Sequence, residues 1–225
     1  MDIDNFCAVL YNYFNCVMRR IIMYNRIIKR FFDILSSGLG ILVLSPVLAL
    51  LAILIKIDSP GPVFFKQKRV GKGKKHFMIY KFRTMRTDAP HDTPTDQLSD
   101  PMRYITRTGK FLRKTSLDEL PQLFNIFKGE MSVIGPRPAL WNQFDLIEER
   151  DKYGANDLRP GLTGWAQING RDELPIPVKA GLDGEYTKKI SLVFDIKCLI
   201  STVTAVLFSK GVVEGDTGKN EINKG

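Results

Sequence analysis

An uncharged apolar segment at residues 34–55 constrains this chain more than any other feature. Of its 22 residues, 14 are Leu, Ile or Val. At about 0.3–0.6 kcal/mol each, these side chains together favour a membrane over water by roughly 4–8 kcal/mol. The alternative is a buried helix of a soluble core, but such helices rarely run this long without a charge. We therefore predict that residues 34–55 enter a lipid bilayer.

Ser45 and Pro46 lie at the centre of this segment. The proline ring lacks an N–H and collides with the carbonyl group of Leu42, which costs about 3 kcal/mol in a straight helix. At 1.5 Å per residue each half reaches roughly 15–18 Å, about half of a ~30 Å hydrocarbon layer. The sequence predicts a re-entrant membrane helix hairpin over residues 29–57. A kinked helix that spans the bilayer is the alternative.

Basic residues flank the apolar segment on both sides. Residues 56–86 hold ten Lys and Arg against one Asp, so their net charge of +9 equals that of the whole chain. Basic flanks mark the cytoplasmic side of a membrane, and charge on both flanks favours a hairpin with both ends on that side. Such a surface also attracts phosphate-rich partners, of which nucleic acid is disfavoured beside a membrane segment.

The remaining pattern predicts an α+β fold that is mainly α-helical. A short β-hairpin is expected around 64–65 and 77–80, and helices are expected up to Arg113, over 120–128, 139–153 and 178–208. The last of these suits an amphipathic helix at the membrane interface. These elements would form a small cytoplasmic catalytic domain over residues 58–208.

The two ends of the chain differ from this domain. Residues 1–28 are predicted to form an amphipathic extension that rests on the membrane or pairs with a second copy in a homodimer. Residues 209–225 are predicted to be a flexible tail. Two histidines and three widely spaced cysteines argue against a zinc site or a histidine-based triad.

Asp118 and Glu119 are the strongest candidates for chemistry. They follow Arg113 and Lys114 and stand at the expected start of a helix, where free N–H groups keep a carboxylate ionised. An ionised Asp118 could attack phosphorus, and its neighbour could hold a divalent cation. The alternative is that Glu119 merely closes a capping box with Ser116.

Two further segments could bind phosphate. Pro136 and Pro138 fix the backbone on either side of Arg137, which would present its guanidinium group as a phosphate clamp. A rigid turn with a solvated arginine is the alternative. The glycine-rich residues 158–171 include Arg159 and Trp165, which could pack on a flat ring, although a packed loop explains them as well.

Six ordered segments together resemble the bacterial sugar transferase family, the small monotopic polyprenyl-phosphate phosphoglycosyl transferases. The resemblance covers about residues 26–208 and leaves residues 1–25 outside. The segments are Lys29-Arg30-x-x-Asp33, Ser45-Pro46, Lys81-Phe82-Arg83-Thr84-Met85, residues 113–123 with Asp118-Glu119, Pro136-Arg137-Pro138, and residues 159–165.

This resemblance implies a reaction at the cytoplasmic face of the bacterial inner membrane. A UDP-sugar would give its phosphosugar to polyprenyl (undecaprenyl) phosphate, leaving a polyprenyl-diphosphate sugar and UMP, as the first membrane step of a glycoconjugate pathway. Asp118 would be the nucleophile of a covalent intermediate, and Glu119 with Asp118 would hold Mg²⁺. A non-catalytic adaptor that binds anionic membrane lipids through residues 56–86 is the alternative.

The resemblance also implies roles for the other motif residues. Arg113 and Arg137 would position phosphates. Lys29, Arg30 and Asp33 would hold the interfacial end of the hairpin, and Ser45 with Pro46 would set its bend. The further phosphate or substrate contacts implied are Lys81, Arg83 and Arg159.

Overall fold

The computed structural model describes residues 23–90, 100–170 and 174–207. The predicted tail and almost all of the predicted N-terminal extension lie outside these residues. The helices are α2 (Lys29–Asp58), α3 (Arg107–Lys114), α4 (Gln122–Lys128), α5 (Phe144–Asp151), α6 (Trp165–Ile168), α7 (Ile176–Lys189) and α8 (Leu192–Leu207), and the strands are β1 (Phe64–Val70), β2 (His76–Phe82), β3 (Ser132–Ile134) and β4 (Gly161–Thr163). The mainly helical α+β fold is confirmed.

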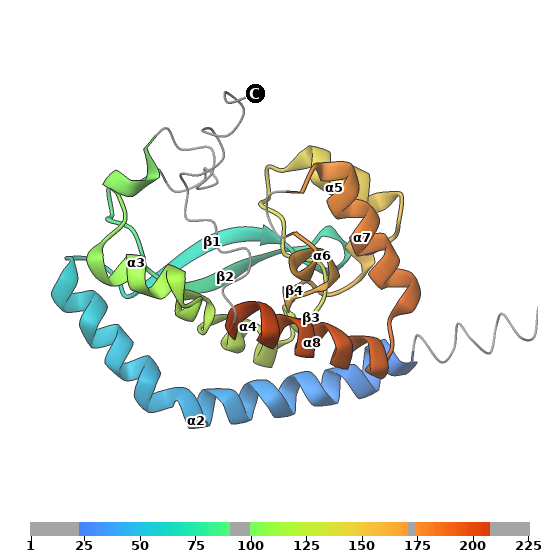
Figure 1. Ribbon diagram of the computed structural model, residues 1–225, viewed down its shortest axis with the longest axis horizontal. Helices are drawn as coiled ribbons and strands as arrows, with labels where there is room; N and C mark the ends of the chain where they lie inside the picture. Colours follow the sequence, from blue (N-terminus) through green and yellow to red (C-terminus); the bar gives the residue numbers. More distant parts are fainter. Residues whose placement is uncertain (1–22, 91–99, 171–173, 208–225) are drawn as a thin grey trace, which may run out of the picture.

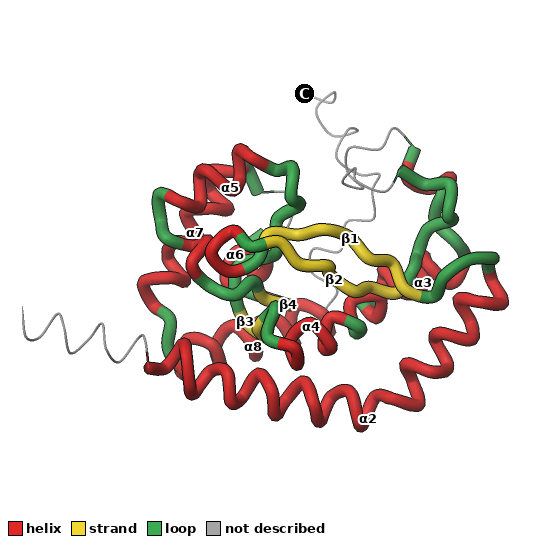
Figure 2. Tube along the Cα trace, turned by 180° about the vertical axis from the view of Figure 1, so that it is seen from behind, coloured by secondary structure: helices red, strands yellow, loops and turns green. Residues whose placement is uncertain are grey.

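Helix α2 runs unbroken through Pro46 but bends near its middle, so that its two ends turn toward the side where the rest of the molecule lies (Figures 1 and 2). Pro46 cannot donate to the carbonyl oxygen of Leu42. The hydroxyl group of Ser45 donates to that oxygen instead, at 2.8 Å. The Ser45-Pro46 pair therefore creates the bend and also satisfies the carbonyl group that the proline leaves without its helical partner.

The outer surface of α2 is apolar and exposed. Leu42 and Ile57 are 71% and 77% exposed, although both are large aliphatic side chains. In the part of the chain that the structure describes, α2 alone is long and apolar enough to cross a membrane, and only 11% of its most apolar window is buried. Because water would strongly disfavour this surface, α2 indicates that the protein associates with a membrane.

Strands β1 and β2 form the expected antiparallel hairpin, with Phe64 opposite Phe82 and Val70 opposite His76. Its turn uses Gly73 and Lys74, both at φ +61°. The side chain of Asn125 in α4 accepts from the Tyr80 N–H at 2.9 Å and donates to the Met78 carbonyl at 2.8 Å. This side chain replaces a neighbouring strand and holds α4 against the edge of β2.

A second, parallel pair of strands joins two segments that the sequence analysis treated as separate turns. Ser132 of β3 pairs with Gly161 of β4, and Ile134 pairs with Thr163. The backbones cross so closely that a Cβ atom at Gly161 would lie 2.1 Å from the Gly135 nitrogen. Glycine at position 161 is therefore required for the Pro136-Arg137-Pro138 segment to lie beside residues 159–163.

Two predicted helices have different bounds in the structure. The segment 139–153 is helical only in α5, because Leu140 pairs with Arg69 as an isolated β-bridge and a turn follows before Phe144. The segment 178–208 is divided between α7 and α8 at Ile190 and Ser191. Helix α8 exposes Val193 and Ile200 and lies beside α2, to which Asp195 is tied by an ion pair with Lys29 at 2.5 Å (Figure 1).

Candidate active site

Asp118 and Glu119 lie on a short 3₁₀ turn, Leu117–Glu119, between α3 and α4. The turn starts at Ser116, whose φ of +57° is unusual for a residue with a side chain. Helix α4 begins only at Gln122, after Pro121, so the predicted helix start at Leu120 was two residues early. The left-handed backbone at Ser116 turns both carboxylates toward the β-hairpin.

The carboxylate of Glu119 accepts from two cations. Lys81 donates to its Oε1 atom at 2.7 Å and Arg137 donates to the same atom at 3.2 Å. The Ser116 side chain makes no capping hydrogen bond. The capping-box alternative is therefore wrong, because Ser116 does not cap the turn and the Glu119 carboxylate binds Lys81 and Arg137 instead.

The environment separates the pKa values of the two carboxyl groups. Burial raises the pKa of Asp118, partly offset by Lys81, whose Nζ lies 3.9 Å from its Oδ2. Burial acts on Glu119 as well, but Lys81 and Arg137 together hold the pKa of Glu119 well below its usual range. Two adjacent carboxyl groups with opposite shifts are typical of sites where the two groups have different tasks.

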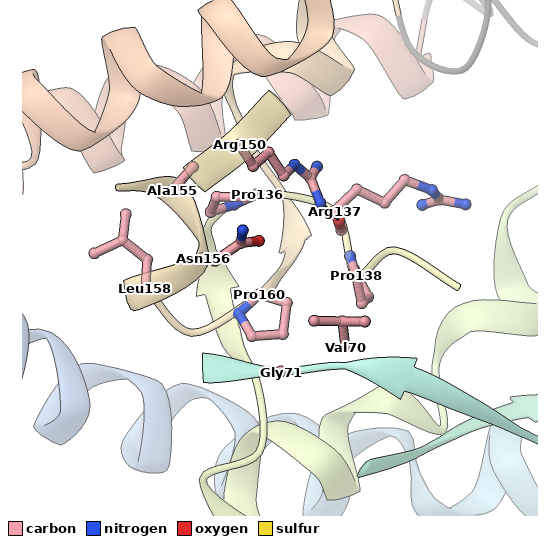
Figure 3. Close-up of a pocket in the computed structure, with 10 residues that line it drawn as sticks. All are labelled: Val70, Gly71, Pro136, Arg137, Pro138, Arg150, Ala155, Asn156, Leu158 and Pro160. Carbon is pink, nitrogen blue, oxygen red and sulfur yellow. Dashed lines mark hydrogen bonds between the residues drawn. The ribbon is translucent and has the colours of Figure 1, made fainter. Parts of the chain in front are cut away.

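Arg137 is held from behind by a buried ion pair. The Arg150 side chain of α5 donates to Asp183 of α7 at 2.6 and 2.8 Å, and also to the Arg137 carbonyl oxygen at 2.9 Å. Figure 3 shows the Arg150 guanidinium beside the Arg137 backbone, between Pro136 and Pro138, while the Arg137 side chain extends away from it. Arg137 therefore reaches Glu119 from a backbone that is fixed on both sides.

Arg113 lies on the last turn of α3, and its Nε donates to the Thr84 hydroxyl oxygen at 2.9 Å. Its charge acts on Asp118, whose pKa it lowers. The structure thus brings together five of the predicted site residues. They are Lys81, Arg113, Asp118, Glu119 and Arg137.

Two other predicted phosphate ligands have structural contacts. The Arg83 guanidinium donates to the carbonyl oxygens of Pro60 and Ser59, at 2.6 and 2.7 Å, and so fixes the turn after α2. The Nε of Arg159 donates to the Gly129 carbonyl at the end of α4. That these two arginines contact substrate stays a prediction.

Trp165 is packed inside the fold. Its indole N–H donates to Glu185 at 2.8 Å, and its ring lies 4.9 Å from that of Phe194. These contacts favour the packed-loop interpretation of residues 158–171 over a platform for a flat ligand.

The first turns of α2 hold the site on the membrane helix. Arg30 donates to the Ile126 and Phe127 carbonyls at the end of α4, at 2.5 and 2.7 Å. Asp33 accepts from the Ser132 hydroxyl and the Val133 N–H, at 3.0 and 2.9 Å. The helix that follows the carboxylates and the strand that leads to Arg137 are therefore both fixed to α2. That this motif holds the interfacial end of a membrane hairpin stays a prediction.

Two residues at the site were missed by the sequence analysis. Arg69 of β1 and Gln122 of α4 line the same small pocket as Lys81, Glu119 and Arg137. Arg69 lay in a long basic run that read as a membrane flank, and Gln122 carries no charge. Strand alternation could have found Arg69, since the hairpin register places residues 67, 69, 79 and 81 on one face.

The donor set has the composition that Mg²⁺ uses in phosphate enzymes. This ion binds through one or two carboxylates together with substrate phosphates and water, and Asp118 and Glu119 supply two adjacent carboxylates. Within the described residues, no group of three or more His, Cys, Asp or Glu side chains could hold a metal ion. A divalent ion here would therefore complete its shell with phosphate oxygens of a ligand and with water.

A family model described as bacterial sugar transferase matches residues 24–209. An uncharacterized sugar transferase of Bacillus subtilis, EpsL, is 43% identical over 187 residues, which are 83% of this chain and 90% of that protein. This match extends over nearly the whole of a relative of similar size.

Two further relatives have more specific names. The undecaprenyl-phosphate glucose phosphotransferase of Komagataeibacter xylinus is 43% identical over 81% of this chain and 36% of its own length. The UDP-N-acetylgalactosamine-undecaprenyl-phosphate N-acetylgalactosaminephosphotransferase of Aeromonas hydrophila is 42% identical over 82% of this chain and 44% of its own length. The chain thus spans less than half of these two relatives.

Proposed function

The chain belongs to the bacterial sugar transferase family, and from this premise we propose that it transfers a sugar phosphate from a UDP-sugar to undecaprenyl phosphate. The family assignment confirms the prediction of a transferase and favours an enzyme over a lipid-binding adaptor. The names of the two relatives support undecaprenyl phosphate as the acceptor, with glucose in one and N-acetylgalactosamine in the other.

The observation that carries the proposal is the pair of adjacent carboxylates with separated environments. Lys81 and Arg137 both donate to the Oε1 atom of Glu119, so two cations neutralise this carboxylate. Asp118 lies 3.9 Å from Lys81, and burial raises the pKa of its carboxyl group. A more basic, less neutralised carboxylate is the better nucleophile, which supports Asp118 as the attacking group.

In the first step, an oxygen of Asp118 attacks the phosphorus that bears the sugar. The bond from that phosphorus to the bridging oxygen breaks, and UMP leaves with the electron pair. In the second step, an oxygen of undecaprenyl phosphate attacks the same phosphorus and restores the Asp118 carboxylate. The product is undecaprenyl-diphosphate sugar.

The surrounding cations would bind the charge of the donor. Lys81 of β2 and Arg137 of the proline-bounded loop contact Glu119, and the charge of Arg113 on α3 acts on Asp118. Three cations from three elements suit the several oxygens of a diphosphate. Asp118 and Glu119 would hold Mg²⁺ together with the donor phosphates. When bound, this ion would neutralise the phosphoryl oxygens.

The membrane helix suits an acceptor whose phosphate lies at the level of the lipid headgroups. We propose that α2 enters the cytoplasmic leaflet of the inner membrane as a re-entrant hairpin and that α8 lies at its surface. Both ends of α2 turn toward the catalytic domain (Figure 1), and the apolar side chains exposed on α2 and α8 would contact lipid.

Release of UMP tests this function directly. The membrane-bound protein is tested with a panel of UDP-sugars that carry hexoses and amino sugars. Multiple turnovers of UMP release should require both Mg²⁺ and undecaprenyl phosphate. Asp118→Asn should abolish turnover while the protein stays folded and membrane-bound. An active Asp118→Asn protein would exclude this mechanism.

A further inference from the structure

Gln122 has a buried side-chain amide that the fold does not use. The residue is 2% exposed, and its Nε2 atom has no hydrogen-bond partner among the described residues. Burying an amide donor without a partner is unfavourable, and native proteins rarely do so without a ligand or a functional reason. Gln122 therefore differs from an ordinary core residue.

Asn125, on the same helix, has a side-chain amide that stabilises the fold. Asn125 is also fully buried, but its side chain binds the Tyr80 N–H, the Met78 carbonyl and the Glu130 carboxylate. These bonds join α4 to the hairpin. The two buried amides are three residues apart but differ in their hydrogen bonding. The Asn125 side chain joins α4 to β2, whereas the Gln122 Nε2 has no partner among the described residues.

The position of Gln122 points to a phosphate ligand. It is the first residue of α4 and follows Glu119, the last residue of the 3₁₀ turn, by three positions. It lines the pocket formed with Arg69, Lys81, Glu119 and Arg137. The pocket thus has three cationic side chains, those of Arg69, Lys81 and Arg137, against the single carboxylate of Glu119, and this excess of positive charge favours an anion in the pocket.

We propose that the Nε2 group of Gln122 donates a hydrogen bond to a phosphoryl oxygen of a bound substrate. This inference rests on the proposed function and adds a substrate-binding residue to it. A neutral donor suits this place, because it binds an oxygen without competing with Lys81 and Arg137 for Glu119. The oxygen belongs to the donor diphosphate or to the acceptor phosphate, and the experiment separates the two.

The test compares Gln122→Met with Asn125→Leu. Gln122→Met keeps the volume and removes the amide, so its thermal midpoint in detergent should equal or exceed that of the native protein, since an unsatisfied polar group is lost. Asn125→Leu should lower the midpoint by several degrees. A similar fall in Gln122→Met would overturn the proposal, because it would show that the amide supports the fold.

Binding measurements identify the substrate group. In Gln122→Met, the Kd for UDP and the rate of UMP release in a single turnover without acceptor should worsen roughly 10- to 100-fold if the amide binds the donor diphosphate. A rise confined to the KM for undecaprenyl phosphate would assign it to the acceptor phosphate. Unchanged values in all three measurements would overturn the proposal.

Measurements on the native protein distinguish a failure of this inference from a failure of the proposed function. If the native protein releases no UMP without acceptor, the two-step mechanism fails, whereas the UDP-binding comparison still tests Gln122. If the native protein does release UMP and Gln122→Met matches it in every measurement, only the role of Gln122 is excluded.

Discussion

Asp33 of α2 accepts a hydrogen bond from the backbone N–H of Val133 at 2.9 Å, although the two residues are 100 positions apart. The same carboxylate oxygen accepts from the Ser132 hydroxyl at 3.0 Å. Strand β3 starts at this point and leads through Gly135 to Arg137. A single buried carboxylate of α2 therefore fixes the strand that leads to Arg137, the arginine that contacts Glu119.

Asp33→Ala should lower the free energy of unfolding by about 2–3 kcal/mol, because it leaves the Val133 N–H and the Ser132 hydroxyl buried without an acceptor. Asp33→Asn retains one acceptor oxygen and should lose less. Thermal or denaturant unfolding in detergent measures both changes. Equal stability of the alanine variant and the native protein would show that the contact does not hold β3.

Asp183→Ala should destabilise the protein by about 3–5 kcal/mol, since it leaves the Arg150 charge buried without its carboxylate partner. A double variant, Arg150→Met with Asp183→Leu, should recover most of this stability because no unpaired charge remains.

The double variant should nevertheless remain poorly active. Its Arg137 carbonyl has lost the Arg150 donor, so the loop that carries Arg137 is less well fixed and kcat/KM should fall by about tenfold or more. Native kcat/KM in a stable double variant would contradict the positioning role of Arg150.

In the pH profile of kcat/KM, the fall in activity on the acidic side, the acidic limb, should occur at a higher pH than the ordinary pKa of an aspartate. Burial raises the pKa of Asp118, and the proposed nucleophile must be ionised. Lys81 lowers that pKa by its charge. Lys81→Gln removes the charge, so the pKa rises and the limb should move to higher pH. If the acidic limb of the Lys81→Gln profile stays at the same pH or moves to lower pH, Lys81 does not control the ionisation of Asp118.

Pro46→Leu should straighten α2, since the new N–H can donate to the Leu42 carbonyl that Ser45 now binds. Cysteines placed at Met23 and Lys72 in an otherwise cysteine-free protein report the topology through a membrane-impermeant thiol reagent. Both should react from the same side in the native background, and from opposite sides in Pro46→Leu. Same-side labelling in both proteins would show that the proline does not set the topology.

Local chemistry made much of this fold predictable. The uncharged run at 34–55, the proline at its centre and the glycines around the hairpin turn each determine structure within a few residues. The pairing of β3 with β4 was not predictable in the same way. It depends on contact between Ser132 and Gly161, which are far apart in the sequence. Strands of three residues are also too short to show the alternation of apolar and polar residues that predicts a strand.

The residues of the candidate site also divide into those that the sequence predicts and those that it does not. Asp118, Glu119 and Arg137 are recognisable by charge and by the rigid residues around them. Gln122 and Arg150 act through burial and through contacts with segments far along the chain, which spacing alone does not show. Arg83 shows the opposite case. Its charge and motif predicted a phosphate contact, but in the structure its guanidinium fixes the turn after α2.

The most direct test of the central claim is the mass of the protein after reaction with a UDP-sugar and Mg²⁺ in the absence of undecaprenyl phosphate. The account predicts one added sugar phosphate on the peptide that contains Asp118, an equal amount of released UMP, and loss of the adduct when undecaprenyl phosphate is added. An enzyme that turns over without any adduct on rapid quenching, or an adduct that persists in Asp118→Asn, would contradict it.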